Sequence, residues 1–162
     1  MNVVGATPHA ESPSDCAAVE GRITRTLSGV KPNRGVRFGA SSHVARFLLA
    51  AREVEPDLRF AVNCRFDDEV AAALATLDWP VAEYDRDAEP ADVKHEEGST
   101  MQWGARQAFG EAGGNGSADE RPVAVVDRGD VGKEAITKLV AEDAGDLAER
   151  VVDLLEAVEG ER

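Results

Sequence analysis

The amino-acid sequence predicts a single α/β domain. Its 162 residues fit one domain with a core of ordinary size, because chains of this length bury about two-thirds of their unfolded surface. Short runs of β-type residues alternate along the chain with stretches whose apolar residues recur at helical spacing. Such alternation is typical of strands and helices arranged around one sheet.

The N-terminal part of the chain predicts one short helix and two strands. Ser14 is placed to cap a short helix that runs toward Val19. Residues 22–27 alternate with β-type residues and predict a strand. Turn-forming residues at positions 28–35 end this strand, and residues 36–38 form the next one.

The middle of the chain predicts two helices separated by a strand. Ser41 or Ser42 caps the first helix, whose apolar residues recur at i, i+3, i+4 and i+7 and give a face that packs on a sheet. The residues of this stripe are Val44, Phe47, Leu48 and Ala51. Residues 58–65 predict a strand in which Cys64 points away from its two neighbours. Asp67 caps a second helix, which continues through Leu77.

The C-terminal half continues the alternation. Residues 80–85 predict a strand, a helix begins at Ser99 or Thr100, and residues 110–119 form an exposed loop. The last elements are a buried strand at 122–126, a turn at 129–133, a strand at 136–140 and a closing helix from Gly145. The closing helix is predicted to face inward with Leu147, Val151, Leu154, Leu155 and Val158.

The composition is strongly acidic, with 31 Asp and Glu against 18 Lys and Arg, for a formal net charge of −13. In molar salt the Debye length falls to about 3 Å, which screens the self-repulsion of such a chain. We therefore expect a halophilic protein whose fold requires salt, although an acidic soluble protein without this requirement has a similar composition. The negative charge also argues against nucleic-acid binding, because no basic face neutralises phosphates.

The cysteines and the hydropathy pattern indicate the cellular compartment. Cys16 and Cys64 lie far apart without metal-ligand spacing, and we expect both to be reduced. No secretory signal pattern and no long apolar run is present. The expected location is the cytoplasm, with no membrane partner.

Residues 38–46 predict an anion site. Here a glycine turn, two hydroxyl residues, a histidine and an arginine surround the start of the helix. The first turn of a helix offers unpaired N–H groups and roughly half a positive charge, which suits a phosphate. Ordinary capping by Ser41 and Ser42, with His43 on the surface, is the alternative interpretation.

Other residues suit phosphate, a heterocycle or a metal. Four arginines at the ends of predicted elements suit phosphate oxygens, although carboxylates also pair with them in so acidic a chain; these are Arg22, Arg46, Arg65 and Arg86. Trp103 fits a place over a flat heterocycle or in the core. Asp127 and Asp130 follow a buried strand, with Lys133 beside them, and are expected to hold Mg²⁺ with pyrophosphate, unless this segment is only an acidic turn. The spacing of the glycines excludes a P-loop.

Six blocks in a fixed order make the chain similar to the archaeal ThiN-type thiamine-phosphate synthase domain. They are residues 21–23 (Gly-Arg-Ile), 38–46 (Phe-Gly-Ala-Ser-Ser-His-Val-Ala-Arg), 63–66 (Asn-Cys-Arg-Phe), 84–86 (Tyr-Asp-Arg), 103–104 (Trp-Gly) and 127–134 (Asp-Arg-Gly-Asp-Val-Gly-Lys-Glu). The resemblance covers the chain from about Val3 to the last helix, and its most specific block is 38–46. It implies a three-layer α/β/α sandwich with a mixed sheet, as one domain over residues 1–162.

The resemblance implies a reaction and roles for residues. Hydroxymethylpyrimidine diphosphate condenses with hydroxyethylthiazole phosphate to give thiamine phosphate and pyrophosphate, with Mg²⁺ stabilising the leaving group. His43 then hydrogen-bonds or protonates the departing pyrophosphate, and Arg22 binds a phosphate. The substrate-binding residues are Ser41, Ser42, Arg46, Asn63, Arg65, Asp85, Arg86, Trp103 and Lys133.

Two departures from the family pattern keep a second function open. Arg52 stands where catalytic members carry Met, and Ala135 stands where Pro is usual. The family domain also occurs fused to a pyrimidine kinase or to a DNA-binding domain, and neither partner is part of this sequence. A non-catalytic module that senses thiamine phosphates is the alternative, which Arg52 favours, whereas Arg22 with His43 favours the enzyme. A homodimer is the default assembly, because symmetric dimers are the commonest oligomers.

Overall fold

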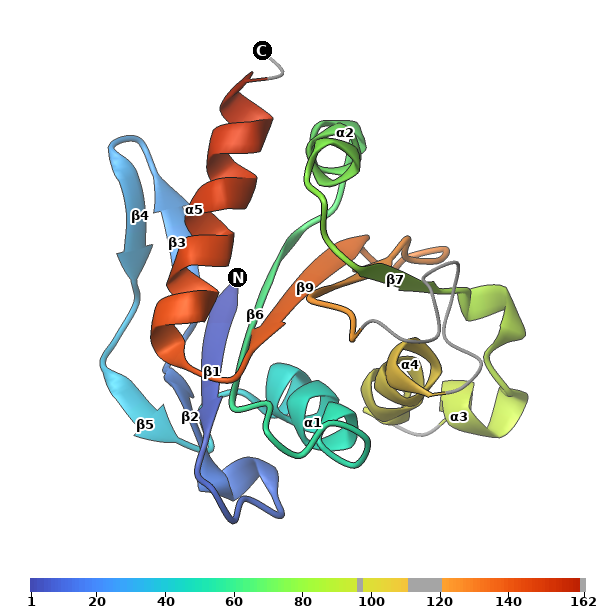
Figure 1. Ribbon diagram of the computed structural model, residues 1–162. Helices are drawn as coiled ribbons and strands as arrows, with labels where there is room; N and C mark the ends of the chain where they lie inside the picture. Colours follow the sequence, from blue (N-terminus) through green and yellow to red (C-terminus); the bar gives the residue numbers. More distant parts are fainter. Residues whose placement is uncertain (96–97, 111–120, 161–162) are drawn as a thin grey trace.

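A computed structural model of the chain describes residues 1–95, 98–110 and 121–160 (Figure 1). Its centre is a seven-stranded sheet in the order β5-β2-β1-β6-β9-β8-β7. β7 and β8 run parallel, and every other neighbouring pair is antiparallel, so the sheet is mixed. The strands are β1 (Asn2–Ala6), β2 (Cys16–Val19), β5 (Val36–Phe38), β6 (Phe60–Arg65), β7 (Val81–Tyr84), β8 (Ala124–Asp127) and β9 (Ile136–Ala141).

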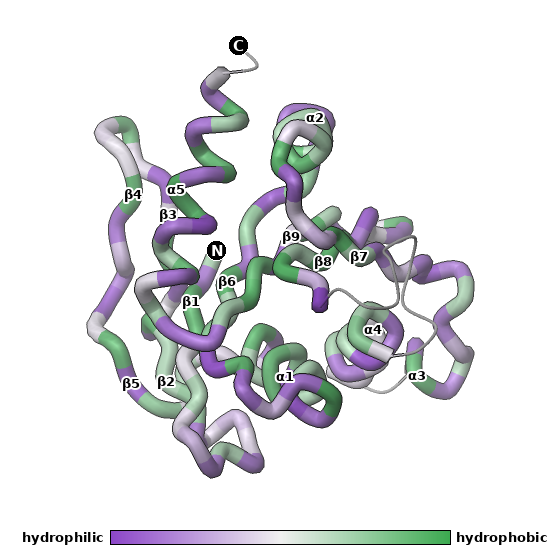
Figure 2. Tube along the Cα trace, in the orientation of Figure 1, coloured by the Kyte–Doolittle hydropathy of each residue, from purple (hydrophilic) through white to green (hydrophobic). Residues whose placement is uncertain are grey.

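Helices cover both faces of this sheet. On one face lie α1 (Ser42–Ala51) and α4 (Ser99–Phe109), with α3 (Ala91–His95) beside α4. On the other face lie α2 (Asp68–Thr76) and α5 (Ala144–Gly160). Buried hydrophobic clusters fill both interfaces, and Figure 2 colours much of α1, β8 and β9 as hydrophobic. The three-layer α/β/α sandwich with a mixed sheet is therefore confirmed.

Local sequence signals correctly predicted where α1 and α2 begin. Ser41 is the N-cap of α1, and all four residues of the predicted apolar stripe of this helix are buried. The carboxylate of Asp67 accepts a hydrogen bond of 3.1 Å from the N–H of Val70 and caps α2. Cys64 packs into the cluster under α2 and α5, where burial raises the pKa of its thiol to about 11. Both cysteines are free thiols.

The predicted helix at Ser14 is wrong. Residues Pro13–Asp15 form a single 3-10 turn, and Cys16 already begins β2. The Asp15 carboxylate accepts hydrogen bonds from the backbone N–H groups of Glu11 and Ser12, and these bonds close the turn. Residues 16–19 then pair with β1 and β5, so tertiary strand pairing overrides the local helix signal.

The predicted turn at residues 28–35 is shorter than expected. The chain reverses at Leu27 and Ser28, and β3 (Ile23–Thr26) and β4 (Gly29–Pro32) form a separate two-stranded hairpin. Gly29 has a φ of +134°, which favours glycine and allows the tight reversal. Figure 1 shows this hairpin projecting away from the sheet.

The closing helix agrees with the prediction except at Leu155. Leu147, Leu154 and Val158 are buried and Val151 is partly buried, whereas Leu155 is 54% exposed on the outer face of α5. The exposed loop predicted at 110–119 lies, apart from Gly110, outside the described residues.

Candidate functional site

The junction between β5 and α1 presents the start of a helix to solvent. Gly39 has a φ of +71° and turns the chain out of β5. The side chain of Ser41 makes no capping hydrogen bond, and the first turn of α1 contains no acidic residue. The N–H groups of this turn and the positive end of the helix dipole therefore suit an anion.

Predicted anion-binding side chains lie beside this helix start. Ser42 and His43 are exposed in the first turn. Arg46 lies one turn further on and packs against Gly98, since a Cβ on Gly98 would come within 1.6 Å of an Arg46 guanidinium nitrogen. Arg46 also lines a cavity of about 450 Å³ between α1, residues 10–13 and Gln102 of α4. Residues 39–46, which contain the helix start, His43 and Arg46, are called the anion-binding junction here, after the site that the sequence predicts for them.

Arg22 lies on a strained loop that leads into the hairpin. Within the part of the chain that the structure describes, it is the one non-glycine residue with a positive φ, +74°. Its N–H donates to the carbonyl of Val19, and its carbonyl accepts a hydrogen bond from the N–H of Asn33. A non-glycine residue in this conformation costs of order 1–3 kcal/mol, and such strain clusters at functional sites. The exposed Arg22 guanidinium is therefore a functional candidate.

Arg22 and His43 lie beyond opposite ends of one strand pair. β2 and β5 are antiparallel, with Val19 opposite Val36 and Ala17 opposite Phe38. Arg22 follows the end of β2, whereas His43 follows the end of β5. Among the described residues, no hydrogen bond or ion pair joins the two side chains. The topology of a single chain therefore separates them.

A second polar cluster is buried at the ends of β7 and β8. Asp127 accepts hydrogen bonds from Nε and Nη2 of Arg86 at 2.7 and 2.6 Å. The Tyr84 hydroxyl donates to Asp127 at 2.6 Å and accepts a hydrogen bond from Nζ of Lys138 at 3.1 Å. Arg86, Asp127 and Lys138 are 6%, 0% and 1% exposed. Two buried cations therefore share one buried carboxylate.

Burial and charge shift the pKa of each group in this cluster. Burial lowers the pKa of Lys138 to about 8, against the attraction of Asp127. Burial raises the pKa of Tyr84, and the charge of Asp127 adds to the rise. Burial alone raises the pKa of Asp127, but the hydrogen bonds from Arg86 and Tyr84 outweigh it, so this pKa lies below its usual value.

Lys138 makes the stability of the fold depend on pH. Its folded-state pKa lies below its unfolded value, so the unfolded chain binds more protons between these two values and stability rises with pH. We expect the free energy of unfolding to rise by about 1 kcal/mol from this residue between pH 7 and 9. Denaturant unfolding of the protein and of Lys138→Met across this range measures the effect. An equal pH dependence in both proteins would contradict it.

Comparison with known proteins identifies the family. The family model described as thiamine-phosphate synthase ThiN matches residues 1–153. The chain is 34% identical over 154 residues to thiamine-phosphate synthase ThiN of Methanothermobacter thermautotrophicus, covering 95% of this chain and 78% of that protein. The chain belongs to the ThiN family.

Other similar proteins carry the ThiN domain as one part. The chain is 31% identical to the bifunctional thiamine biosynthesis protein ThiDN of Methanocaldococcus jannaschii, covering 93% of this chain but 33% of that protein. Among solved structures, the C-terminal domain of a phosphomethylpyrimidine kinase superposes with a TM-score of 0.86 at 33% identity, covering 94% of this chain and 83% of that one. A further solved C-terminal domain gives a TM-score of 0.85 at 27% identity and covers 99% of this chain and 83% of that one.

Three residues that were predicted to bind substrate or metal have other partners in the structure of this ThiN chain. Arg86 and Asp127 bind each other, so neither offers the free guanidinium or carboxylate that the prediction requires. Asp85 is exposed and caps the 3-10 turn Arg86–Ala88 through the N–H of Asp87. These side chains hold the segment after β7 on the sheet.

The predicted magnesium ligands do not fit a preformed metal site. Both oxygens of Asp127 accept hydrogen bonds from the cluster, and Asp130 accepts one from the N–H of Val131. No group of three or more His, Cys, Asp or Glu side chains suited to a metal ion occurs in residues 1–95, 98–110 and 121–160. A magnesium ion held mainly by protein carboxylates at Asp127 is therefore not supported.

The remaining predicted residues lie in separate parts of the structure, with Asn63 and Arg65 on β6, Trp103 on α4 and Lys133 in the turn after β8. Asn63 accepts a hydrogen bond of 2.7 Å from the N–H of Asn2, and Arg65 forms ion pairs with Asp67 and Glu69. Trp103 packs edge-on against Tyr84, with ring centroids 5.8 Å apart. Lys133 is exposed on the turn after β8, where its backbone bridges to Asp130. None of these contacts joins the four residues to a residue of the anion-binding junction.

Lys138 and Tyr84 belong to the buried cluster, and the sequence analysis assigned neither of them a role. Lys138 interrupts the apolar strand β9, with both of its neighbours buried as well. A lysine within such a run is almost never buried unless it is paired. That signal is present in the sequence and predicts a buried carboxylate partner, although it does not identify Asp127.

Arg52 lies at the end of α1 and lines the same cavity as Arg46. Its Nη1 and Nη2 atoms donate hydrogen bonds to the carbonyl oxygens of Thr7 and Pro8, at 3.2 and 2.7 Å. The side chain therefore fixes the loop after β1 to the end of α1.

Proposed function

We propose that this ThiN chain is a thiamine-phosphate synthase. It would join hydroxymethylpyrimidine diphosphate to hydroxyethylthiazole phosphate and release pyrophosphate. Membership of the ThiN family supports this reaction class. The single observation that carries the proposal is the start of α1, where no capping bond from Ser41 and no acidic residue competes with an anion and where His43 is exposed.

The reaction requires stabilisation of the charge on the leaving pyrophosphate, and it does not require a strong base. The bond from the pyrimidine methylene carbon to the diphosphate oxygen breaks, and the thiazole nitrogen forms a new bond to that carbon. The electron pair of the broken bond leaves on pyrophosphate, whose growing charge the N–H groups of α1 and His43 would stabilise. Arg22 and Arg46 would bind phosphate oxygens through their planar guanidinium groups.

Magnesium would reach the site with the substrate. Mg²⁺ is commonly held by substrate phosphates together with one or two carboxylates. We therefore infer that the diphosphate supplies most ligands of this ion, because Asp127 is bound within the buried cluster. The residues of the junction would then bind the oxygens that the ion leaves free.

Product formation tests the proposal. The purified protein is incubated with both substrates and Mg²⁺ in about molar KCl, and thiamine phosphate and pyrophosphate are measured. We expect both products in equal amounts. If neither forms while thiamine phosphate raises the melting temperature, the chain is a sensing relative and not a synthase.

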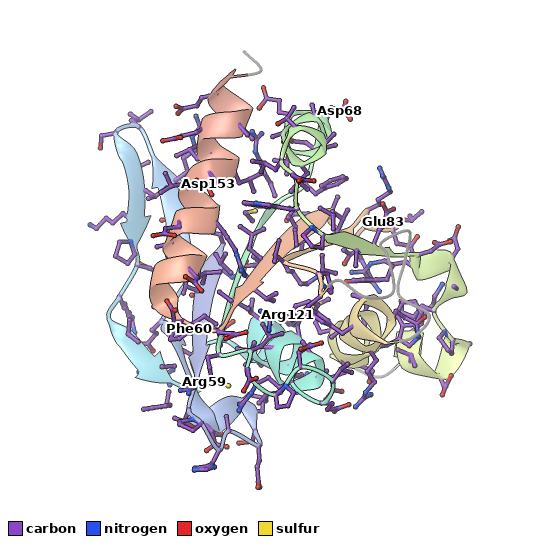
Figure 3. The ribbon with its side chains drawn as sticks, viewed as in Figure 1. Arg59, Phe60, Asp68, Glu83, Arg121 and Asp153 are labelled. Atoms are coloured by element: carbon purple, nitrogen blue, oxygen red, sulfur yellow. The ribbon has the colours of Figure 1, made fainter. Side chains whose placement is uncertain are left out.

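We infer that the protein works in a salt-rich cytoplasm without nucleic acid or membrane. Exposed carboxylates such as Asp68, Glu83 and Asp153 point outward from three different elements (Figure 3). Within the described residues, no helix is long and apolar enough to cross a bilayer. The net charge of −13 argues against DNA as a partner, because DNA carries a high density of negative phosphates.

Salt is expected to stabilise the fold. The net charge of −13 repels itself in dilute buffer, and molar salt screens charges more than about 3 Å apart. The melting temperature should therefore rise when KCl is increased from 0.1 to about 1 M. Calorimetry at several salt concentrations measures this. A melting temperature that does not change with KCl would contradict a salt-requiring fold.

A further inference from the structure

The side chain of Arg46 reaches from α1 to the start of α4. These two helices lie side by side on one face of the sheet (Figure 1). Gly98 is the N-cap of α4 and has a φ of +87°. A Cβ on Gly98 would come within 1.6 Å of Nη1 and 2.7 Å of Cζ of Arg46. Any other residue at position 98 would therefore occupy the space that the Arg46 guanidinium fills.

Buried contacts hold α4 in this position. The Thr100 hydroxyl donates a hydrogen bond of 2.5 Å to the carboxylate of Glu89, which is 4% exposed. One turn further on, Gly104 lets the helix backbone approach the ring of Tyr84, since a Cβ on Gly104 would come within 2.5 Å of the ring carbon Cζ. Tyr84 itself belongs to the buried cluster at the ends of β7 and β8. The start of α4 therefore cannot move away from Arg46 without breaking these contacts.

A side chain at position 98 would displace Arg46 and leave the helix in place. The guanidinium is the far end of a flexible side chain, so it can rotate away, whereas the backbone of α4 is held from below. Gly98 makes no side-chain capping bond, so its replacement removes no such contact from the helix. The positive φ adds a cost in stability to the substitution. The loss of stability and the displacement of Arg46 are therefore separate effects, which can be measured separately.

The position of the Arg46 guanidinium matters for phosphate binding. A planar guanidinium donates paired hydrogen bonds to phosphate oxygens only in a suitable orientation. A misplacement of about 1 Å can cost about 100-fold in rate. Arg46 follows His43 by three positions in α1, and residues three apart are neighbours on a helix surface. A displaced guanidinium would therefore lose its place beside His43.

We propose that Gly98 is a positioning residue, which keeps the guanidinium of Arg46 in place to bind a phosphate group of a substrate. The proposal rests on the proposed function, which assigns phosphate oxygens to Arg46. Gly98 contributes through Arg46 and needs no contact with the substrate. Its contribution therefore disappears when Arg46 is removed.

A double-mutant cycle tests this role. Arg46→Ala is expected to lower kcat/KM for thiamine phosphate formation by about 10- to 100-fold, because it removes charge-assisted hydrogen bonds. Gly98→Ala should lower kcat/KM by about tenfold through the displaced guanidinium. The double variant should stay within about twofold of Arg46→Ala, since a change that acts through Arg46 has no effect once Arg46 is gone. Wild-type kcat/KM in Gly98→Ala, or losses that multiply in the double variant, would overturn the proposal.

Two further variants separate the displacement of Arg46 from backbone strain. Gly98→Asn places the same Cβ at position 98 in a residue type that tolerates a positive φ, and it should lose as much kcat/KM as Gly98→Ala. Gly29→Ala is the matched control, because Gly29 also has a positive φ, +134°, but a Cβ there meets no atom within 4 Å. It should lower the melting temperature and keep wild-type kcat/KM. An equal loss of kcat/KM in Gly29→Ala would assign the effect to strain and overturn the proposal.

The positioning role and the proposed function fail separately. If the wild-type protein makes no thiamine phosphate, the proposed function fails, and calorimetric titration of the same variants with pyrophosphate and with thiamine phosphate decides the role of Gly98. Weaker binding in Gly98→Ala that disappears in the Arg46→Ala background supports it. Equal binding by the wild-type protein and Gly98→Ala, or no binding by the wild-type protein, overturns it. If Arg46→Ala keeps wild-type kcat/KM, the synthase stands and the positioning role is overturned.

Discussion

Replacing Asp127 with alanine is expected to lower the free energy of unfolding by about 3–5 kcal/mol, because it removes one partner of a buried ion pair. Arg86 would keep its charge in the interior without a carboxylate. Lys138 would lose the attraction of Asp127, which opposes the effect of burial on its pKa. The Tyr84 hydroxyl would also lose its acceptor. The loss should appear as a lower denaturant midpoint with little change in the slope of the transition.

Glu83→Ala is the matched control for Asp127→Ala. Glu83, on the strand next to β8, also pairs with an arginine, Arg128, but both side chains of this pair are exposed. Exposed ion pairs contribute about 0–1 kcal/mol. Similar losses in the two variants would show that the buried cluster is no more important than a surface pair. Asp127→Asn should fall between them, because the amide oxygen still accepts a hydrogen bond while the charge is gone.

His43→Ala is expected to reduce turnover by about 10²–10⁴-fold, the usual contribution of a general acid or base. The melting temperature should stay close to that of the wild-type protein, because His43 is exposed. The measurement is the rate of thiamine phosphate formation at saturating substrates, with the melting temperature recorded for the same preparation.

Two further variants show what His43 contributes. His9→Ala removes another exposed histidine, far from α1 in the sequence, and should keep full turnover. His43→Gln retains a hydrogen-bond donor that does not titrate near neutral pH. Recovery of turnover by His43→Gln would assign hydrogen bonding, and not proton transfer, to His43. Full activity in His43→Ala would remove this residue from the mechanism.

Much of the fold could be predicted because the relevant signals are local. Asp67 begins α2 through a bond to a residue three positions away, and the stripe Val44 to Ala51 lies within a single helix. The prediction was wrong where pairing between strands distant in the sequence determines the secondary structure. Residues 16–19 form a strand because β1 and β5 flank them, and residues 29–32 are extended because β3 lies opposite.

The candidate site was predictable in part for the same reason. The anion-binding junction at residues 39–46 is continuous in sequence, so its glycine, hydroxyl groups and histidine already indicate it. Arg86, Asp127 and Lys138 come from three separate segments, and only the packed sheet brings them together. A guanidinium that suits phosphate in isolation binds a buried carboxylate here, because desolvation makes an unpaired charge too costly.

The sequence by itself determined the α/β class, the ThiN family and the acidic character of the chain, because composition, periodicity and short motifs are properties of neighbouring residues. For the same reason it predicts the anion-binding junction. The tertiary structure decided the buried ion cluster, the projecting β3–β4 hairpin and the separation of Arg22 from His43. These features depend on which strands pair and in which direction. Strand pairing joins residues far apart in the chain, and its energy comes from burial that no local segment achieves alone.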